Sequence, residues 1–258
     1  MNDYEVLKNY EQSVTLSDNK PWIIKLSLPD SFKQAFVTVY DKFMMTCLLD
    51  VTKYICERLP GARIGYVFDG TIILIINPEN VVLPKMQELL SSVCSGVTLQ
   101  FNIIWNTYIK KYMQSNKVTP EQLSTNEYYK DILPYITHNM HATFIGHCFE
   151  VDSIEDLQVY LTVSQRLWFS QAINKVWNAN FVTKAPAAMS DTDKLKVFEE
   201  SQIDFYGLGT KFYKGQTVFK TTKKTENNEP KTVWIDYAAP SFRANKIFIE
   251  KIYNDTFI

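Results

Sequence analysis

Glycine, long apolar runs and net charge are all scarce in this sequence of 258 residues. Only 8 glycines accompany an aromatic content of 14%, which argues for an ordered, well-packed protein and against a loop-rich or disordered one. The longest apolar stretch, Thr71–Asn77, is far too short to span a bilayer, so we expect no membrane association. The net charge of −1 gives no global attraction to nucleic acid or acidic lipid. Any polyanion binding must therefore rest on local basic patches.

Cysteine is also sparse, with four residues and no Cys-x-x-Cys pair. We expect Cys47, Cys56, Cys94 and Cys148 to be buried free thiols in a reducing cytosol. The acidic, polar start Met1–Glu5 does not have the character of a signal peptide. These features predict a cytoplasmic protein, or one in the host cytoplasm if it is encoded by a virus.

Apolar periodicity and turn signals predict alternating elements in the first part of the chain. Asp69-Gly70 joins two β-rich runs and is a strong hairpin signal, because a type I′ turn needs positive φ at both central residues. The predicted order β-α-β-β-α-β comprises 22–26, 31–59, 63–68, 71–76, 84–94 and 97–105. This is the ferredoxin-like order of polymerase and cyclase palm domains, and it hosts many functions.

The second part of the chain predicts additions to this core. Residues 110–134 are polar and rich in tyrosine, as expected of an inserted excursion. The further predicted elements are a strand at 143–150, helices at 157–177 and 190–201, and strands at 212–221 and 231–237 that flank a loop at 222–230. Either Asp152 or Ser153 can cap the first of these helices.

The predicted fold class is therefore α+β, a ferredoxin-like polymerase palm with helical and β-hairpin C-terminal additions. We divide the chain into an N-terminal extension at 1–20, a palm-like core at 21–110, and an insertion with a C-terminal lobe at 111–258 that packs on the palm. The length and the 46% hydrophobic content suit one elaborated domain or two closely packed lobes.

Four stretches, in the right order, resemble motifs of the tRNA-His guanylyltransferase family, which adds nucleotides in the 3′-to-5′ direction. Lys25–Phe32 stands where the family has R-I-D-G-R-x-F, and Gly61–Ile72 where it has G-A-R-I-G-Y-T-Q-S-D-E-I. Phe149–Gln165 resembles the family's strand, helix start and Y-L-x-W-R-Q segment, and Ile203–Gly215 resembles its closing G-I-D-F…F-K-Y-G-T piece. The resemblance covers about residues 20–225 and implies the palm fold, with Mg²⁺ and GTP or ATP if the chain is active.

The family's chemistry needs two metal ions that clamp the attacking and leaving oxygens. Magnesium is a hard ion that requires carboxylates, and the family supplies them from the Asp of R-I-D-G and the Asp of S-D-E. In this chain the first position is Ser27, and the second is Gly70 followed by Thr71. Neither Ser nor Gly supplies an anionic oxygen, and the nearest carboxylates are Asp30 and Asp69.

A relocated metal pair of Asp30 and Asp69 is one interpretation of these departures. A shift of one residue along a strand turns a side chain to the opposite face, so Asp69 could serve only if a bulge or the turn re-aims it. The alternative, which we favour, is that Asp69 is simply the first residue of the Asp-Gly turn. No catalytic residue is therefore assigned beyond these two candidates.

Other family positions point to lost chemistry as well. The segment that helps hold the incoming triphosphate keeps only Asp41, and the basic helix that receives phosphates keeps only Lys85. By resemblance, the positions that would contact a nucleotide are Ser27, Ser31, Asp41 and Gly70. Retained scaffold residues with replaced catalytic residues are the pattern of a pseudoenzyme.

Lysines interleaved with aromatic residues in the C-terminal part favour RNA contact, through phosphate attraction and base stacking. The predicted RNA-binding lysines are Lys85, Lys211, Lys214 and Lys220. The alternative is a solvated hairpin whose lysines keep its edge from pairing with other chains.

Three histidines and a cysteine lie close together in the sequence: His138, His141, His147 and Cys148. Ligands of this kind bind zinc at similar spacing, but no second pair of ligands exists and His147 and Cys148 alternate on a predicted strand. Surface or core histidines are the default interpretation.

Three hypotheses follow. The first is a palm-type protein that has lost nucleotidyl transfer and binds RNA, a nucleotide or a protein partner. The second is an active Mg²⁺-dependent transferase that acts on the tRNA 5′ end with relocated carboxylates. The third is a structural or assembly subunit without nucleotide contact. The resemblance also implies a homo-oligomer, since family members are typically tetrameric.

Overall fold

The computed structural model describes residues 17, 20–34, 42–77, 85–119, 121–122, 125, 141–181, 183, 189–224, 229–254 and 256. Its centre is a six-stranded antiparallel sheet with the order β4-β1-β3-β2-β5-β6. The strands are β1 (Trp22–Ser27), β2 (Ala62–Phe68), β3 (Thr71–Ile76), β4 (Ile145–Glu150), β5 (Gln216–Lys224) and β6 (Pro230–Ala238).

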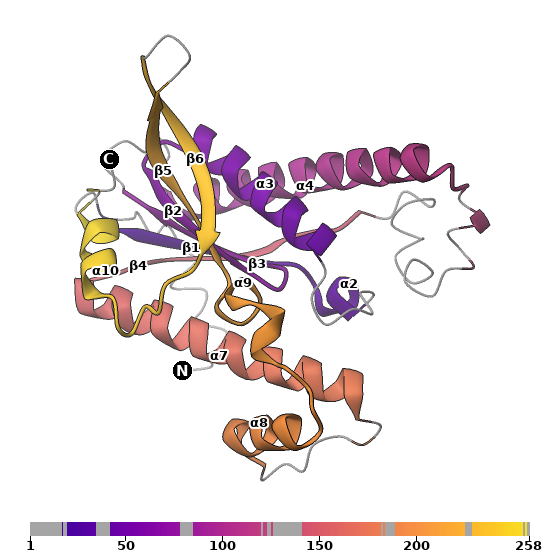
Figure 1. Cartoon of the computed structure of the whole chain (residues 1–258). Coiled ribbons are helices and arrows are strands. Elements are labelled where there is room, and N and C mark those ends of the chain that lie inside the picture. The colour runs from indigo at the N-terminus through magenta and orange to yellow at the C-terminus, as the bar shows by residue number, and fades with distance from the viewer. Residues whose placement is uncertain are drawn as a thin grey trace, which may run out of the picture.

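Helices cover both faces of the sheet, with α3 and α4 on one side and α7 and α10 on the other (Figure 1). They are α2 (Asp30–Gln34), α3 (Lys42–Arg58), α4 (Met86–Asn116), α7 (Ile154–Asn180), α8 (Asp191–Glu200), the 3-10 helix η2 (Tyr206–Leu208), α9 (Thr210–Lys214) and α10 (Lys246–Tyr253). None of the described helices combines the length and apolar composition that crossing a membrane requires.

Two hydrophobic cores result, one on each face of the sheet. Along β1, Ile24 and Leu26 pack into the core under α3 and α4, whereas Ile23 packs into the core under α7. The residues of β2 and β3 are buried throughout, because strands covered on both faces have near-continuous hydrophobic runs. In chain order, β1, α3, β2, β3, α4 and β4 give the predicted β-α-β-β-α-β palm, which confirms the fold class.

The strand predicted at 97–105 is wrong, because these residues belong to the long helix α4. Every fourth residue of this helix is buried: Leu89, Val93, Val97, Phe101, Trp105 and Ile109. A spacing of four places these residues on one side of a helix. A strand with the same buried residues would also bury the positions midway between them, whereas Ser91, Ser95 and Leu99 are exposed. The last strand of the palm is β4 instead, and 110–116 continue α4 rather than beginning the predicted excursion.

Smaller departures occur at other boundaries. The predicted helix at 31–59 contains α2 and α3, and the residues 35–41 between them lie outside the described part. Phe212, predicted to begin a strand, lies in α9, and Gly215 with φ of 78° separates that helix from β5. A Cβ at Gly215 would lie 2.8 Å from the Val67 carbonyl oxygen, so this close approach requires glycine.

Local signals at other boundaries are confirmed. Asp69 and Gly70 have φ of 31° and 74°, the positive values that a type I′ hairpin turn requires. Ser153, one of the two candidate caps, accepts a hydrogen bond of 3.1 Å from Asp156 N at the start of α7. The next predicted helix begins after Ser190, which caps α8.

Candidate functional site at the sheet edge

The ends of the central strands β1 and β3, which we call the sheet edge, bring together several positions that the resemblance assigns to nucleotide and metal contacts. β1 ends there at Ser27, whose cross-strand partner is Thr71, the first residue of β3. The turn Asp69-Gly70 joins β2 to β3 at the same edge. Leu28 N donates a hydrogen bond of 2.8 Å to the Gly70 carbonyl oxygen, which fixes the turn against the end of β1.

Two hydroxyl groups face each other at this edge. Ser27 Oγ and Thr71 Oγ1 are 3.4 Å apart. Because side chains alternate along a strand, these residues lie on the same face as Ile23 and Ile73, which belong to the core under α7. The edge therefore presents two neutral oxygens on the α7 side of the sheet.

The Asp69 carboxylate is bound by a lysine from α7. Lys175 Nζ donates a hydrogen bond to Asp69 Oδ1, and only 13% of the Asp69 side chain is exposed. The Lys175 ammonium also lies 5.8 Å from the centre of the Trp168 ring, in a cation–π contact. The turn and the ion pair together hold the Asp69 carboxylate against α7.

Asp30, the other candidate carboxylate, is bound to a different lysine. Its side chain is 81% exposed at the start of α2, and Lys33 Nζ lies 2.6 Å from Asp30 Oδ1. The hydrogen bond from Lys33 and the charge of Lys33 lower the pKa of Asp30. The stem of Lys33 lies over Gly70, since a Cβ on that glycine would be 2.9 Å from Lys33 Cδ. Asp30 and Asp69 thus each pair with their own ammonium.

The other predicted nucleotide contacts are only partly described. Asp41 and the side chain of Ser31 lie outside the described residues. Within the described part of the chain, no group of three or more His, Cys, Asp or Glu side chains has a geometry that could hold a metal ion. The roles assigned to Ser27, Ser31, Asp41 and Gly70 stay predictions.

A hollow of about 530 Å³ lies beside the edge, between α3, α9 and the base of the β5–β6 hairpin. Lys53 and Lys211 line it and share Asp236, with Nζ–Oδ distances of 2.5 Å and 3.8 Å. Tyr108 donates a hydrogen bond of 2.6 Å to Asp50, another lining residue, and this bond with partial burial raises the pKa of Tyr108 to about 12. The hollow is polar, and most of its charges are paired.

The predicted RNA-binding lysines are distributed over different parts of the surface. Lys85 precedes α4 and pairs with Glu88 at 3.5 Å. Lys211 lines the hollow just described, whereas Lys214 and Lys220 each line a different one. The described structure therefore does not gather the four into one patch, and their role in RNA binding stays a prediction.

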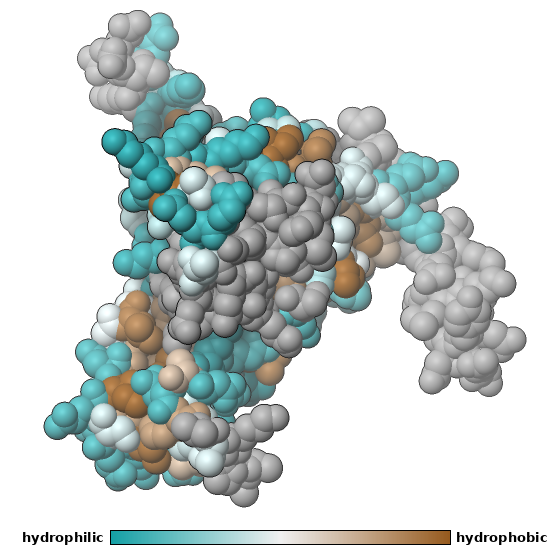
Figure 2. All heavy atoms as spheres, turned by 90° about the vertical axis from the view of Figure 1, so that its right-hand side faces the viewer, coloured by the Kyte–Doolittle hydropathy of each residue, from teal (hydrophilic) through white to brown (hydrophobic). Residues whose placement is uncertain are grey.

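The β5–β6 hairpin contains a cross-strand pair of like charges. Lys223 and Lys231 are direct partners in the register, and both are exposed. Lys220 lies opposite Trp234, with its ammonium 5.4 Å from the ring centre. Figure 2 shows that hydrophilic atoms surround the outer part of this hairpin. Like charges placed opposite each other destabilise a sheet, so the Lys223–Lys231 pair costs stability in the free protein.

The histidine group divides between the two faces and the undescribed residues. His138 lies outside the described part, whereas His141 and His147 are exposed. Cys148 faces the core under α3 and α4, where burial and the charge of Glu150 raise its pKa to about 12. The structure does not bring His147 and Cys148 together on one face.

Lys175 was not predicted from the sequence. It follows Trp168 by seven residues on α7, on the helix side that also buries Ala172. A lysine within such an apolar stripe is a detectable signal, because a charge on a core-facing side of a helix requires a partner. The sequence did not reveal that Asp69 is that partner, since the two are 106 positions apart.

The sheet, its turn and its two layers of helices define the fold class as an α+β, ferredoxin-like palm. No protein-family model matches the chain, and no curated protein sequence matches it. Comparison with solved structures does identify proteins of similar fold. A bacterial tRNA-His guanylyltransferase (Thg1)-like protein in complex with ATP has a TM-score of 0.71 and 16% identity, over 98% of this chain and 99% of that one.

Two further structures agree. A bacterial Thg1-like protein in complex with GTP has a TM-score of 0.69 and 14% identity, over 97% of this chain and 98% of that one. The tRNA-His guanylyltransferase of Saccharomyces cerevisiae has a TM-score of 0.60 and 11% identity, over 84% of this chain and 92% of that one. The chain therefore has the fold of the tRNA-His guanylyltransferase-like proteins, as the four motifs predicted.

Proposed function

We propose that this protein is a divergent member of the tRNA-His guanylyltransferase family that has lost metal-dependent nucleotidyl transfer and acts by binding RNA. The proposal rests mainly on the composition of the sheet edge. Ser27 and Thr71 contribute neutral hydroxyls there, and the Asp69 carboxylate is already bound to Lys175.

These residues do not fit a pair of magnesium ions. Each Mg²⁺ requires several hard oxygen ligands, with carboxylates to offset its charge. The hydroxyls of Ser27 and Thr71 carry no charge, and a metal ion at Asp69 would have to displace the Lys175 ammonium from Asp69 Oδ1. We therefore assign no catalytic step to this edge.

Two observations support RNA as the ligand class. The similar structures are named as enzymes of tRNA-His or as proteins like them, and two of these hold ATP or GTP. In this chain, Lys220, Lys223 and Lys231 place three positive charges on the β5–β6 hairpin, two of them in direct cross-strand opposition. A phosphate backbone relieves that repulsion and releases its own counterions on binding.

The first experiment tests the loss of catalysis. The protein is incubated with Mg²⁺, labelled GTP and a tRNA-His transcript bearing a 5′-triphosphate or an activated 5′ end. We expect no addition of label to the tRNA 5′ end. Template-dependent addition would contradict the proposal, and its loss in Asp69→Asn with folding preserved would then identify Asp69 as the relocated metal ligand.

The second experiment tests RNA binding. Fluorescence anisotropy with a labelled tRNA transcript compares the wild-type protein with the variant Lys220→Ala/Lys223→Ala/Lys231→Ala. We expect the variant to bind about tenfold more weakly. The slope of its log affinity against log salt concentration should be smaller, as expected for the loss of roughly two to three phosphate contacts. Lys196→Ala, an exposed charge on α8, is the matched control. No tRNA binding by the wild type at moderate salt would contradict the proposal and favour an assembly role.

A further inference from the structure

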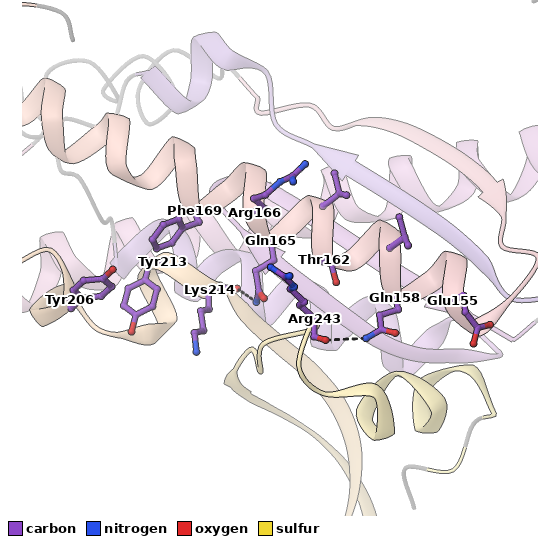
Figure 3. A pocket seen from close by; sticks show the side chains of 12 residues that line it. Glu155, Gln158, Thr162, Gln165, Arg166, Phe169, Tyr206, Tyr213, Lys214 and Arg243 are labelled. Atoms are coloured by element: carbon purple, nitrogen blue, oxygen red, sulfur yellow. Dashed lines mark hydrogen bonds between the residues drawn. The ribbon is translucent and has the colours of Figure 1, made fainter. Parts of the chain in front are cut away.

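Another hollow, of about 990 Å³, lies on the outer side of α7 (Figure 3), and its described lining includes no residue of the β5–β6 hairpin. Its floor is the helix from Glu155 to Phe169, and its other wall consists of η2, the end of α9 and the loop at Arg243. At 1.5 Å per residue, this stretch of α7 is about 21 Å long. We call this hollow the α7 groove.

Two half-buried amide side chains hold the walls of the α7 groove in place. Gln165 Nε2 donates to the carbonyl oxygens of Lys214, at 3.1 Å, and Pro240, at 2.9 Å, while Gln165 Oε1 accepts from Phe242 N at 3.3 Å. Gln158 Nε2 donates to the carbonyl oxygens of Phe242 and Arg243 at 3.2 Å and 3.3 Å. The groove is therefore formed in the free protein, which lowers the ordering cost of binding.

The charged side chains in the groove are mostly cationic. Arg166, Lys214 and Arg243 line it, and none of the three forms an ion pair with a described residue. Figure 3 shows Arg243 extending from its loop toward α7. The one carboxylate, Glu155, lies at the far end and pairs with Lys246 at 3.5 Å. Three positive charges in a concave surface favour a polyanion.

Aromatic rings gather at the opposite end of the groove from Glu155 (Figure 3). Tyr206 and Tyr213 are in edge contact with ring centres 5.4 Å apart, and Phe169 contacts Tyr213 at 6.1 Å. Tyr206 is 57% exposed, so a face of its ring is open to a ligand. Rings beside cations are the combination that binds unstacked bases and their phosphates.

We propose that the α7 groove binds a short single-stranded segment of RNA, with bases stacked on Tyr206 and its neighbours and phosphates on Arg166, Lys214 and Arg243. This inference rests on the proposed RNA-binding function and adds the location and the kind of RNA structure recognised. The groove's length exceeds that of one nucleotide and suits several successive ones. Its aromatic end requires unpaired bases, which a duplex does not offer.

Binding measurements with three probes test the proposal: a labelled single-stranded oligoribonucleotide of about eight residues, the corresponding RNA duplex, and free ATP or GTP. We expect Tyr206→Leu to weaken binding of the single strand about tenfold, since stacking on one ring contributes that order of affinity. Arg166→Ala/Arg243→Ala should reduce the salt slope for the single strand by about one to one and a half. Neither variant should change duplex binding, and Tyr112→Leu on α4 and Lys196→Ala are the matched controls.

Photo-crosslinking locates the strand directly. An oligoribonucleotide with 4-thiouridine is irradiated with the full-length protein, and the crosslinked peptides are identified by mass spectrometry. We expect crosslinks within 154–180 or 206–214.

Wild-type RNA binding that is unchanged in the groove variants, or crosslinks confined to the β5–β6 hairpin, would overturn the proposal that RNA binds in the α7 groove and leave the proposed function standing. Binding of free ATP or GTP that is lost in the groove variants, without single-strand binding, would identify a nucleotide site instead. Absence of RNA binding by the wild type would overturn both proposals.

Discussion

The ion pair between Lys175 and Asp69 lies mostly out of solvent, since 32% and 13% of the two side chains are exposed. Charges in such a position depend on each other, because neither can be fully hydrated while the fold is intact. The Trp168 ring beneath Lys175 adds a second favourable contact for the ammonium. At the residue scale, the pair therefore has a structural role that does not involve a ligand.

Replacing Lys175 tests this dependence. Lys175→Met should lower the free energy of unfolding by about 1–3 kcal/mol, because it leaves the Asp69 carboxylate unpaired in a mostly buried position. Urea denaturation followed by tryptophan fluorescence measures the change. Lys246→Met, which removes two solvent-exposed ion pairs, with Glu155 and Glu250, should leave the midpoint nearly unchanged. Equal stability of the two variants would contradict the structural role of the Lys175–Asp69 pair.

The buried thiol of Cys56, the half-buried thiol of Cys148 and the buried Tyr66 hydroxyl predict how stability depends on pH. Burial raises the pKa of Cys56 and of Tyr66, and it raises the pKa of Cys148 to about 12. Between the unfolded and the folded pKa of such a group, the folded state binds more protons than the unfolded state, so stability falls as pH rises. The fall begins near the unfolded thiol value of about 8.5 and amounts to about 1 kcal/mol per thiol for each further pH unit. Urea midpoints at about pH 7.5 and about pH 9.5 measure it, and Cys148→Ala should make the decline less steep.

At the scale of elements, the β5–β6 hairpin carries an unfavourable charge pair, and its strand β6 is the outermost strand on that side of the sheet. Lys223→Glu converts the pair with Lys231 into an attractive one, so we expect stability to rise by about 0.2–1 kcal/mol. The same change should weaken RNA binding severalfold, because one phosphate contact is lost and a repulsive charge is added. Thermal denaturation and anisotropy with the tRNA probe measure the two effects. A stability gain without a loss of affinity would show that the hairpin lysines serve only to keep the outer strand from pairing with other chains.

The elements also show which local signals suffice for prediction. The Asp-Gly turn and the helix start near Ser190 are set by neighbouring residues, so the sequence alone predicted them. The segment 97–105 was misassigned because its apolar residues suit a strand as well as a helix over nine positions. Only the whole apolar stripe from Leu89 to Ile109, which is much longer than a typical strand, indicates a helix.

At the scale of the whole molecule, one sheet separates two cores, and the central strands belong to both. The amides of β1, β2 and β3 should therefore exchange hydrogen most slowly, because they open only on global unfolding. The outer part of the β5–β6 hairpin, which is exposed and lacks helix cover at Lys223 and Lys231, should exchange faster. Peptide-resolved hydrogen exchange measures this ranking, and equal protection across β2 and the outer hairpin would contradict it.

The candidate sites were predicted less completely than the fold. The resemblance assigned Ser27, Gly70 and the neighbouring Asp69 to the family's metal-site region because each lies within a motif that is continuous in sequence, and the strand register brings them together. Lys175 and Arg243 could not be placed in this way, since their neighbours in space are distant in the chain. Gln165 was identified from the resemblance, but its bonds to Lys214, Pro240 and Phe242 follow only from the tertiary structure.

The Lys175–Asp69 ion pair also determines which mutational routes to a metal-binding site are open. Ser27→Asp alone would add a second carboxylate to an edge whose existing one is held by Lys175, so a divalent ion would gain only part of its ligands. Loss of Lys175 alone would leave the Asp69 carboxylate without a partner. The effects of changes at residues 27 and 175 should therefore be non-additive, because both act on the surroundings of the Asp69 carboxylate. A divalent ion at Asp69 would thus need both a further anionic ligand and the release of the carboxylate from Lys175.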